Sequence, residues 1–172
     1  MIPLRAQWVT VSVLLAGTIA TMVALGRHGK ILKTQGCHRI LDLELAPTKA
    51  KAQKVVNDWK KAGLVEHALE DIRFDYAFIA LYSTTLALLA FIGAQMLTGF
   101  LARVGPALGW SMWLAGALDV VENVGMTIEL RGRPAIAPLV CAAAGVKWLL
   151  VIIGVIDGLI VVGGIVFALF RR

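Results

Sequence analysis

The chain alternates long apolar runs with shorter polar connections. Four runs are long enough for a helix to cross the hydrocarbon core of a bilayer, which takes about 17–25 residues. They cover residues 8–25, 76–101, 107–130 and 138–165. This pattern predicts an all-α integral membrane protein with one membrane domain over residues 1–172, built as a bundle of four transmembrane helices.

The polar segment between the first two runs has a pattern of its own, and residues 40–72 are amphipathic. Within it, residues 41–45 alternate three leucines with Asp42 and Glu44. Alternation of apolar and acidic residues with period two is typical of an extended strand-like piece. We therefore expect a short extended segment before the next helix.

A helix is predicted over residues 49–62, because Thr48 is a suitable N-cap and the apolar positions recur at helical spacing. Its apolar face holds Val55, Val56 and Trp59, and its lysines lie outside that face. One interpretation places this amphipathic helix in the membrane interface, with those three side chains toward lipid. The other interpretation packs the helix against the end of the bundle. The two interpretations are compatible, and we expect the helix to rest on the membrane surface through these three side chains.

The last apolar run has two possible registers in the bilayer. As a single helix, residues 136–170 would be about 52 Å long, which exceeds the ~30 Å hydrocarbon core. In the first register Lys147 is buried within the bundle. In the second register Lys147 extends to the interface and Asp157 lies near the bilayer centre. Gly154 and Gly158 form a GxxxG contact face in either case.

Composition and charge also point to a membrane. Hydrophobic residues make up 59% of the chain and the mean hydropathy is +0.79, whereas soluble domains have about 45–50% apolar residues. The net charge of +6 lies mostly beside the predicted spans, so we expect membrane lipids as partners, and no nucleic acid. Loop 26–74, with Arg131 and Arg133, carries twelve Lys and Arg, against four on the opposite side. The positive-inside rule then predicts a bacterial inner-membrane protein with that loop cytoplasmic and both termini outside.

The third run carries polar side chains that a lipid-facing helix does not tolerate. Asp119, Glu122 and Asn123 stand at i, i+3 and i+4, so they share one face of a helix. An ionised carboxylate near the bilayer centre costs about 2.5–3.5 kcal/mol on insertion scales. These groups should therefore face protein, water or a partner.

Three spans place polar groups at a similar depth. Glu122 and Lys147 each lie nine residues inside the expected membrane boundary, or about 13 Å at the rise of a helix. Tyr82 lies seven residues past Asp75, or about 10 Å. We expect the candidate site to consist of Tyr82, Asp119, Glu122, Asn123 and Lys147, with Glu44, Asp75 and Asp157 as secondary candidates.

Three roles fit this cluster: a polar clasp in which Lys147 pairs with Glu122 or Asp119 and sets the helix register, a ligand, proton or ion site, or a catalytic pair. A haem held by histidine in the bundle is not expected, because all three histidines lie outside the predicted spans. Cys37 and Cys141 form no CxxC pair, and Cys37 and His38 with His28 lack metal-ligand spacing. We expect no metal and no cofactor.

Several short motifs resemble a family of small four-helix bacterial membrane proteins that has no established activity. They are residues 41–46 followed by a helix ending in Trp59, residues 75–78 leading to Tyr82, Leu118-Asp119 with Glu122-Asn123, and Lys147. The resemblance covers roughly residues 40–150. It implies the four-helix architecture and the polar positions, but no reaction.

The function that we expect is non-enzymatic. The protein binds a small ligand or a lipid at its polar cluster, or it is an accessory subunit of a membrane complex or a homo-oligomer. The alternative is a lipid-modifying enzyme in which Asp119 or Glu122 acts as acid or base. A polar cavity beside Glu122 would favour binding or catalysis, and an exposed face of small residues would favour a subunit.

Overall fold

The computed structural model describes residues 3–133 and 136–170. Residues 1–2, 134–135 and 171–172 lie outside this description, and with them Pro134, Arg171 and Arg172. The described chain is helical nearly throughout. In chain order its helices are α1 (Leu4–Gly36), α2 (Ile40–Glu44), α3 (Lys49–Lys61), α4 (Val65–Met96), α5 (Gly99–Leu130) and α6 (Ala137–Phe170).

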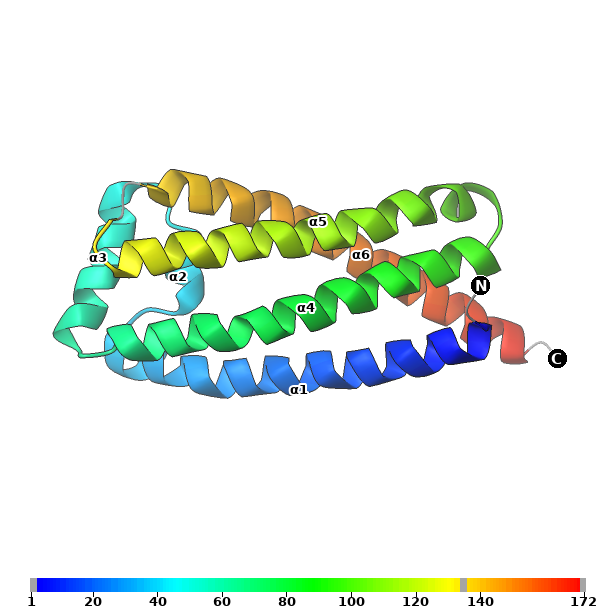
Figure 1. Cartoon of the computed structure of the whole chain (residues 1–172), viewed down its shortest axis with the longest axis horizontal. Coiled ribbons are helices and arrows are strands. Elements are labelled where there is room, and N and C mark those ends of the chain that lie inside the picture. The colour runs from blue at the N-terminus through cyan, green and yellow to red at the C-terminus, as the bar shows by residue number, and fades with distance from the viewer. Residues whose placement is uncertain (1–2, 134–135, 171–172) are drawn as a thin grey trace.

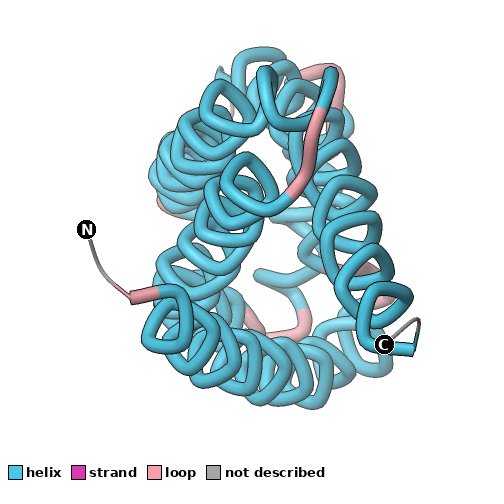
Figure 2. Tube along the Cα trace, turned by 90° about the vertical axis from the view of Figure 1, so that its right-hand side faces the viewer, coloured by secondary structure: helices cyan, strands magenta, loops and turns pink. Residues whose placement is uncertain are grey.

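Four long helices make up the body of the molecule and run along its long axis (Figure 1). Each of α1, α4, α5 and α6 is long and apolar enough to cross a membrane. Both labelled termini lie at one end of the bundle, and α2 and α3 lie at the other (Figure 1). Figure 2 views the molecule along its long axis from the end with the termini and shows the helices gathered around that axis. The predicted all-α, four-span membrane architecture, with short helices between the first two spans, is confirmed.

Close approaches at glycine hold the bundle together, and α4 packs against α1, α5 and α6. A side chain at Gly116 of α5 would meet Cβ and Oγ of Ser83 in α4 at 2.9 Å. Gly154 of α6 lies against Met112 of α5, and Gly158 lies against Leu89 of α4. The GxxxG face of α6 is therefore a contact face, as predicted, and it is used inside the bundle.

The turn between the second and third spans lies earlier than the predicted boundary at residues 101–107. Helix α4 ends at Met96, and the chain reverses through Leu97 and Thr98, which are extended. Gly99 then has φ +71°, a left-handed conformation that glycine adopts without strain. Pro106 lies inside α5 and not in the connection. The reversal depends on the conformation of these three residues, which the hydropathy pattern does not register.

The polar segment over residues 26–74 is more helical than its composition suggests. Helix α1 continues past the first apolar run to Gly36, where Cys37 closes it in a left-handed conformation with φ 59°. Helix α4 already begins at Val65. His28 and His67 therefore lie on long helices and not in a loop.

Helix α3 packs across the end of the bundle. Val55, Val56 and Trp59 are buried, and Trp59 has no exposed surface. They belong to a core that also includes Leu32 of α1 and Leu130 of α5. Of the two interpretations, packing on the bundle is the one that the structure shows. The expectation that these three side chains contact lipid is wrong, because protein covers them.

The segment expected to be extended is instead the short helix α2. Asp42 stabilises its first turn, because its carboxylate accepts a 2.7 Å hydrogen bond from the backbone N–H of Arg39. Leu43 and Glu44 of α2 are buried against the bundle. Thr48 is the N-cap of α3 as predicted, with its Oγ1 accepting from the N–H of Lys51 at 3.4 Å. The alternation in residues 41–45 was too short to distinguish a strand from one helical turn.

Candidate functional site

The ammonium of Lys147 in α6 lies at the centre of a buried charged cluster. Its Nζ is 3.0 Å from Oε1 of Glu44, 3.0 Å from Oδ1 of Asp119 and 2.9 Å from Oε2 of Glu122. The four side chains are at most 7% exposed. We call Glu44, Asp119, Glu122 and Lys147 the Lys147 cluster.

The members of the cluster come from three helices, and each helix positions its residues in a different way. Asp119 and Glu122 are one turn apart on α5, so helical geometry alone directs both toward α6. Lys147 lies in the middle of an apolar helix, where its long stem packs with its neighbours while the ammonium meets the carboxylates. Glu44 comes from α2, outside the four spans. A residue from the short helix between the first two spans thus completes the cluster.

Two further hydrogen bonds extend the polar region across α4. The hydroxyl of Tyr82 donates to Oδ2 of Asp119 at 2.9 Å. Nδ2 of Asn123 donates to Oδ2 of Asp75 at 2.8 Å. Tyr82, Asn123 and the cluster carboxylates are nearly inaccessible, whereas Asp75 is half-buried. The predicted network that joins Glu122 and Lys147 with Asp119 and Tyr82 is confirmed.

Trp148 contacts the cluster as well, although the sequence pattern did not single it out. Its Nε1 donates a 2.7 Å hydrogen bond to Oε1 of Glu44. Its ring centroid is 5.3 Å from Nζ of Lys147, within the range of a cation–π contact. Trp148 as a whole residue is 41% exposed. Glu44 therefore receives one donor from Lys147 and one from Trp148, which fixes α2 on α6.

The charges in the cluster do not balance. Three carboxylates surround one ammonium, so with every group ionised the Lys147 cluster carries two more negative than positive charges. Asp75 lies nearby through its bond to Asn123 and has an amide as its partner, not a cation. An unpaired charge that is removed from water costs several kcal/mol. The excess negative charge of the cluster is therefore unfavourable in a buried site unless it is neutralised.

Asp157 is buried as well, but it does not join the cluster. It is 6% exposed, and its Oδ2 has no hydrogen bond to any described residue. It lies ten residues beyond Lys147 on the same helix, or about 15 Å. Both residues are buried on the continuous helix α6, so the burial of Asp157 occurs without Lys147 extending out of the bundle as the second register predicts. Lys147 occupies the position that the first register gives it.

Glu129 is a buried acid that the sequence analysis missed. It has no exposed surface, and neither carboxylate oxygen is hydrogen-bonded within the part of the chain that the structure describes. It lies seven residues after Glu122 on α5, so it continues the same face. That spacing is the feature of the sequence that could have identified Glu129 as a residue facing the bundle. It was overlooked because Glu129 lies close to the end of the predicted span.

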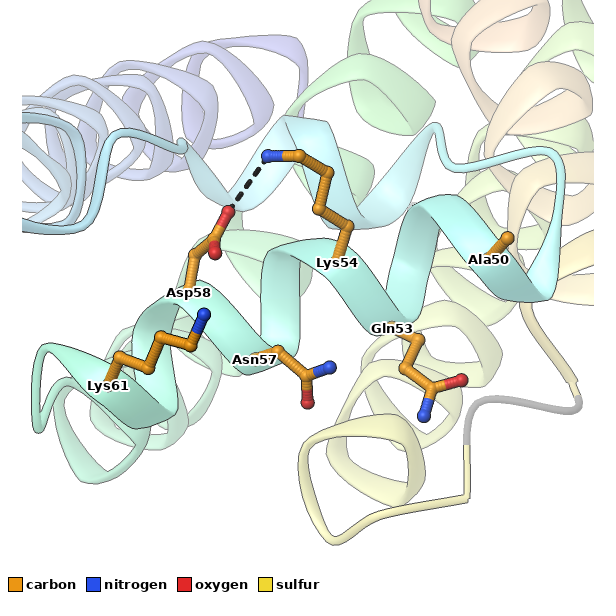
Figure 3. Close-up of a pocket in the computed structure, with 6 residues that line it drawn as sticks. All are labelled: Ala50, Gln53, Lys54, Asn57, Asp58 and Lys61. Atoms are coloured by element: carbon orange, nitrogen blue, oxygen red, sulfur yellow. Dashed lines mark hydrogen bonds and ion pairs between the residues drawn. The ribbon is translucent and has the colours of Figure 1, made fainter.

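The outer face of α3 carries a separate polar network (Figure 3). Lys54 donates a 2.9 Å hydrogen bond to Oδ2 of Asp58, and Nε2 of His38 lies 2.9 Å from the same oxygen. The bond from Lys54 and then the one from His38 lower the pKa of Asp58 from 3.8 to about 2. The surface depression here is lined by residues of α3 alone, namely Ala50, Gln53, Lys54, Asn57, Asp58 and Lys61. One face of one helix offers no enclosed site.

The described chain thus folds as a multi-pass helical bundle with a charged cluster buried inside it. Comparisons with protein-family models, curated proteins and solved structures found no match. The structure itself shows four candidate membrane spans and three carboxylates gathered around Lys147.

Proposed function

We propose that this is a non-enzymatic multi-pass membrane protein whose Lys147 cluster binds a small positively charged ligand. The shared chemistry is an amine or a small cation, supplied as a free solute or as the amine of a lipid headgroup. The observation that carries the proposal is that three buried carboxylates share one ammonium.

A purely structural clasp explains less of this arrangement. One carboxylate would neutralise Lys147 and set the register of α5 against α6. The second and third carboxylates add negative charge without a further cation of the protein, which is unfavourable in a buried site. A ligand with one or two positive charges removes that imbalance. An amine ligand would donate hydrogen bonds to these same carboxylate oxygens.

The position of Glu44 gives the ligand a route to the cluster. Glu44 belongs to a five-residue helix between the spans, and its contacts with α6 are its bonds to Lys147 and Trp148. Displacement of α2 would expose the other carboxylates while the long helices stay packed. The exposed Trp148 beside this point offers an aromatic face to an incoming cation.

The other functions expected from the sequence have less support. A lipid-modifying enzyme would need Asp119 or Glu122 free to exchange a proton with substrate. Both oxygens of Asp119 are occupied, one by Lys147 and the other by Tyr82. An accessory subunit would be favoured by a free GxxxG face, but Gly154 and Gly158 pack inside the bundle. The binding function therefore comes first.

The proposal also covers the type of membrane, the orientation of the chain in it and the protein family. We place the protein in a bacterial inner membrane with the α2–α3 end cytoplasmic, because that end carries most of the lysines and arginines. We also assign it to the small four-helix family that its short motifs resemble. Those motifs supply Glu44, Tyr82 and Lys147, which meet in one network with Asp119.

The test is to purify the full chain in mild detergent and to identify bound amines, cations and lipids by native mass spectrometry. We expect one positively charged ligand per chain, lost in Glu44→Gln. The glutamine keeps the shape of the side chain and can still accept from Lys147. Glu66→Gln is the matched control, because Glu66 is an exposed acid in the first turn of α4, and it should retain the ligand.

Two results would contradict this function. Wild-type protein without a bound positively charged species, together with a higher unfolding temperature for Glu44→Gln, would show that protons alone neutralise the cluster. Equal ligand retention in Glu44→Gln and Glu66→Gln would place the ligand elsewhere. Lipid analysis of the same sample separates a headgroup amine from a free solute.

A further inference from the structure

A second group of ionisable side chains lies outside the Lys147 cluster, between α1 and α4. His28 projects from α1, and His67 and Glu70 project from α4. One potential ligand atom from each residue lies within 4.8 Å of the others. Around tetrahedral Zn²⁺, ligand atoms at 2.0–2.1 Å from the metal are separated by about 3.3 Å. Coordination would require the stacked imidazole rings to rotate, so that one nitrogen of each points at the ion.

The hydrogen bond made by His67 fixes which of its nitrogens is available. Its Nε2 lies 3.1 Å from the backbone carbonyl oxygen of His28. A carbonyl only accepts, so Nε2 carries the hydrogen and Nδ1 keeps a free lone pair. Histidines that bind metals typically donate their other N–H to a carbonyl or a carboxylate in this way.

Asp71 lies beside the imidazole of His28. Its Oδ1 lies 3.4 Å from Nδ1 of His28, although the two atoms form no hydrogen bond. A hydrogen on Nδ1 would face the carboxylate and leave Nε2 as the free nitrogen. Asp71 is only 4% exposed, and Oδ1 makes no hydrogen bond of good geometry with a described residue. Gly29 of α1 borders the carboxylate, since a Cβ there would come within 3.5 Å of Oδ2. A metal on Nε2 would make the Nδ1–H more acidic and favour a hydrogen bond from it to Asp71.

The charge of this group selects the class of ligand. With both imidazoles neutral, Glu70 and Asp71 together carry two negative charges, which match one divalent cation. Two imidazoles and a carboxylate are a common ligand set for Zn²⁺ and related transition metals, with a fourth position left for water. Glu70 is exposed, so that fourth position can reach solvent.

We propose that His28, His67 and Glu70 bind a divalent transition-metal ion, with Zn²⁺ as the expected ion, and that Asp71 orients His28. The site joins α1 to α4 at the end of the bundle near α3. Helix α1 contacts mainly α4, so the metal would fix the position of the outermost helix. The two imidazole rings stack with their centroids 3.9 Å apart, so they already lie side by side between α1 and α4.

The experiment uses the full chain in detergent, purified without a histidine tag and stripped with a chelator. Zn²⁺ is titrated by calorimetry, and the metal content is measured after gel filtration. We expect one Zn²⁺ per chain and a higher unfolding temperature in its presence. Co²⁺ should give the absorption spectrum of a nitrogen and oxygen site, and Zn²⁺ should displace it.

The variants separate a ligand site from surface binding. Glu70→Gln changes an exposed residue and leaves the fold intact, so a loss of affinity of tenfold or more is expected from the missing ligand. His67→Gln should remove stoichiometric binding. Asp71→Asn should weaken affinity by about 10–100-fold at unchanged stoichiometry, as outer-sphere partners do. His38→Gln is the control, because His38 pairs with Asp58 away from the site.

The proposal is overturned if stripped wild-type protein takes up no stoichiometric Zn²⁺. It is also overturned if His38→Gln lowers the affinity as much as His67→Gln, or if Glu70→Gln binds like wild type. Because the Lys147 cluster contributes no ligand here, Glu44→Gln should bind Zn²⁺ normally whether or not the cluster binds its own ligand.

Discussion

The Nζ of Lys147 in α6 lies 3.0 Å from the carboxylate of Glu44 in α2, although the two residues are 103 positions apart in the chain. Asp119 and Glu122 of α5 complete the coordination of the same ammonium. A short helix between two spans is thereby bonded to the middle of the last span. The stability of the bundle and the occupancy of its site depend on the same lysine.

Replacing Lys147 should destabilise the protein more than replacing any one of its carboxylates. Lys147→Met leaves three buried carboxylates without a cation, and we expect a loss of about 3–5 kcal/mol. Glu122→Gln should cost less, because Lys147 keeps Glu44 and Asp119. Unfolding in mixed detergent micelles measures both, with Lys30→Met, an exposed lysine of α1, as control. The double variant should recover only part of the loss, and wild-type stability of Lys147→Met would contradict the buried cluster.

Tyr82→Phe removes the hydroxyl that donates to Oδ2 of Asp119. A hydrogen bond to a charged group contributes about 1.5–3 kcal/mol, and the oxygen left behind stays buried. We expect a loss of that size in the free energy of unfolding. Tyr76→Phe is the matched control, because Tyr76 is exposed on the same helix, and it should change stability little. Equal effects of the two substitutions would show that the Tyr82 hydroxyl is not bonded.

Asp58 should confer a pH dependence on α3 at the acidic end of the scale. Its folded pKa of about 2 lies below the ordinary value of 3.8, mainly through the hydrogen bond from Lys54. A depressed carboxyl pKa stabilises the folded state above the unfolded pKa. That contribution is lost as pH falls from about 3.8 toward 2. Carbon-detected NMR titration should show the pKa of Asp58 rising toward 3.8 in Lys54→Met and staying low in Lys51→Met. No difference between the two variants would exclude the bond.

Gly116→Ala should weaken the contact between α4 and α5. The new Cβ would meet Ser83 of α4 at 2.9 Å. Ser83 follows Tyr82 directly, and Gly116 lies three residues before Asp119 in α5. The helices must move apart, which typically costs about 1–3 kcal/mol and lengthens the bond between Tyr82 and Asp119. Gly145→Ala is the control, since a Cβ there has no atom within 4 Å among the described residues. Thermal unfolding should show a loss for the first variant and none for the second.

The orientation can be tested with the exposed Cys37 at the end of α1. In a Cys141→Ser background, a membrane-impermeant thiol reagent should fail to label Cys37 in intact, reduced cells. It should label Cys37 after lysis, because the charge distribution predicts that the α3 end is cytoplasmic. Labelling before lysis would reverse the proposed orientation and leave the fold unchanged.

Hydropathy and helical periodicity predicted the spans and much of the site, because both are local properties of the chain. Runs of apolar residues identified four membrane helices, and the spacing of Asp119, Glu122 and Asn123 predicted their common face. Matched depth paired Lys147 with Glu122, and the structure joins them. Local patterns were less reliable where the chain turns, since the reversal at Gly99 depends on backbone conformation and not on hydropathy.

For other residues, only the tertiary structure decided which distant segments meet. Glu44 reaches Lys147 because α2 docks against α6, and His28 stands beside His67 because α1 and α4 extend as helices into the polar segment. Trp59 faces the bundle and not lipid because the end of the bundle offers an apolar surface to cover. The apolar face of an amphipathic helix must be buried, but its sequence does not specify whether lipid or protein covers it. The sequence therefore determined the helices and their apolar faces. Packing between the helices decided which partner each face contacts.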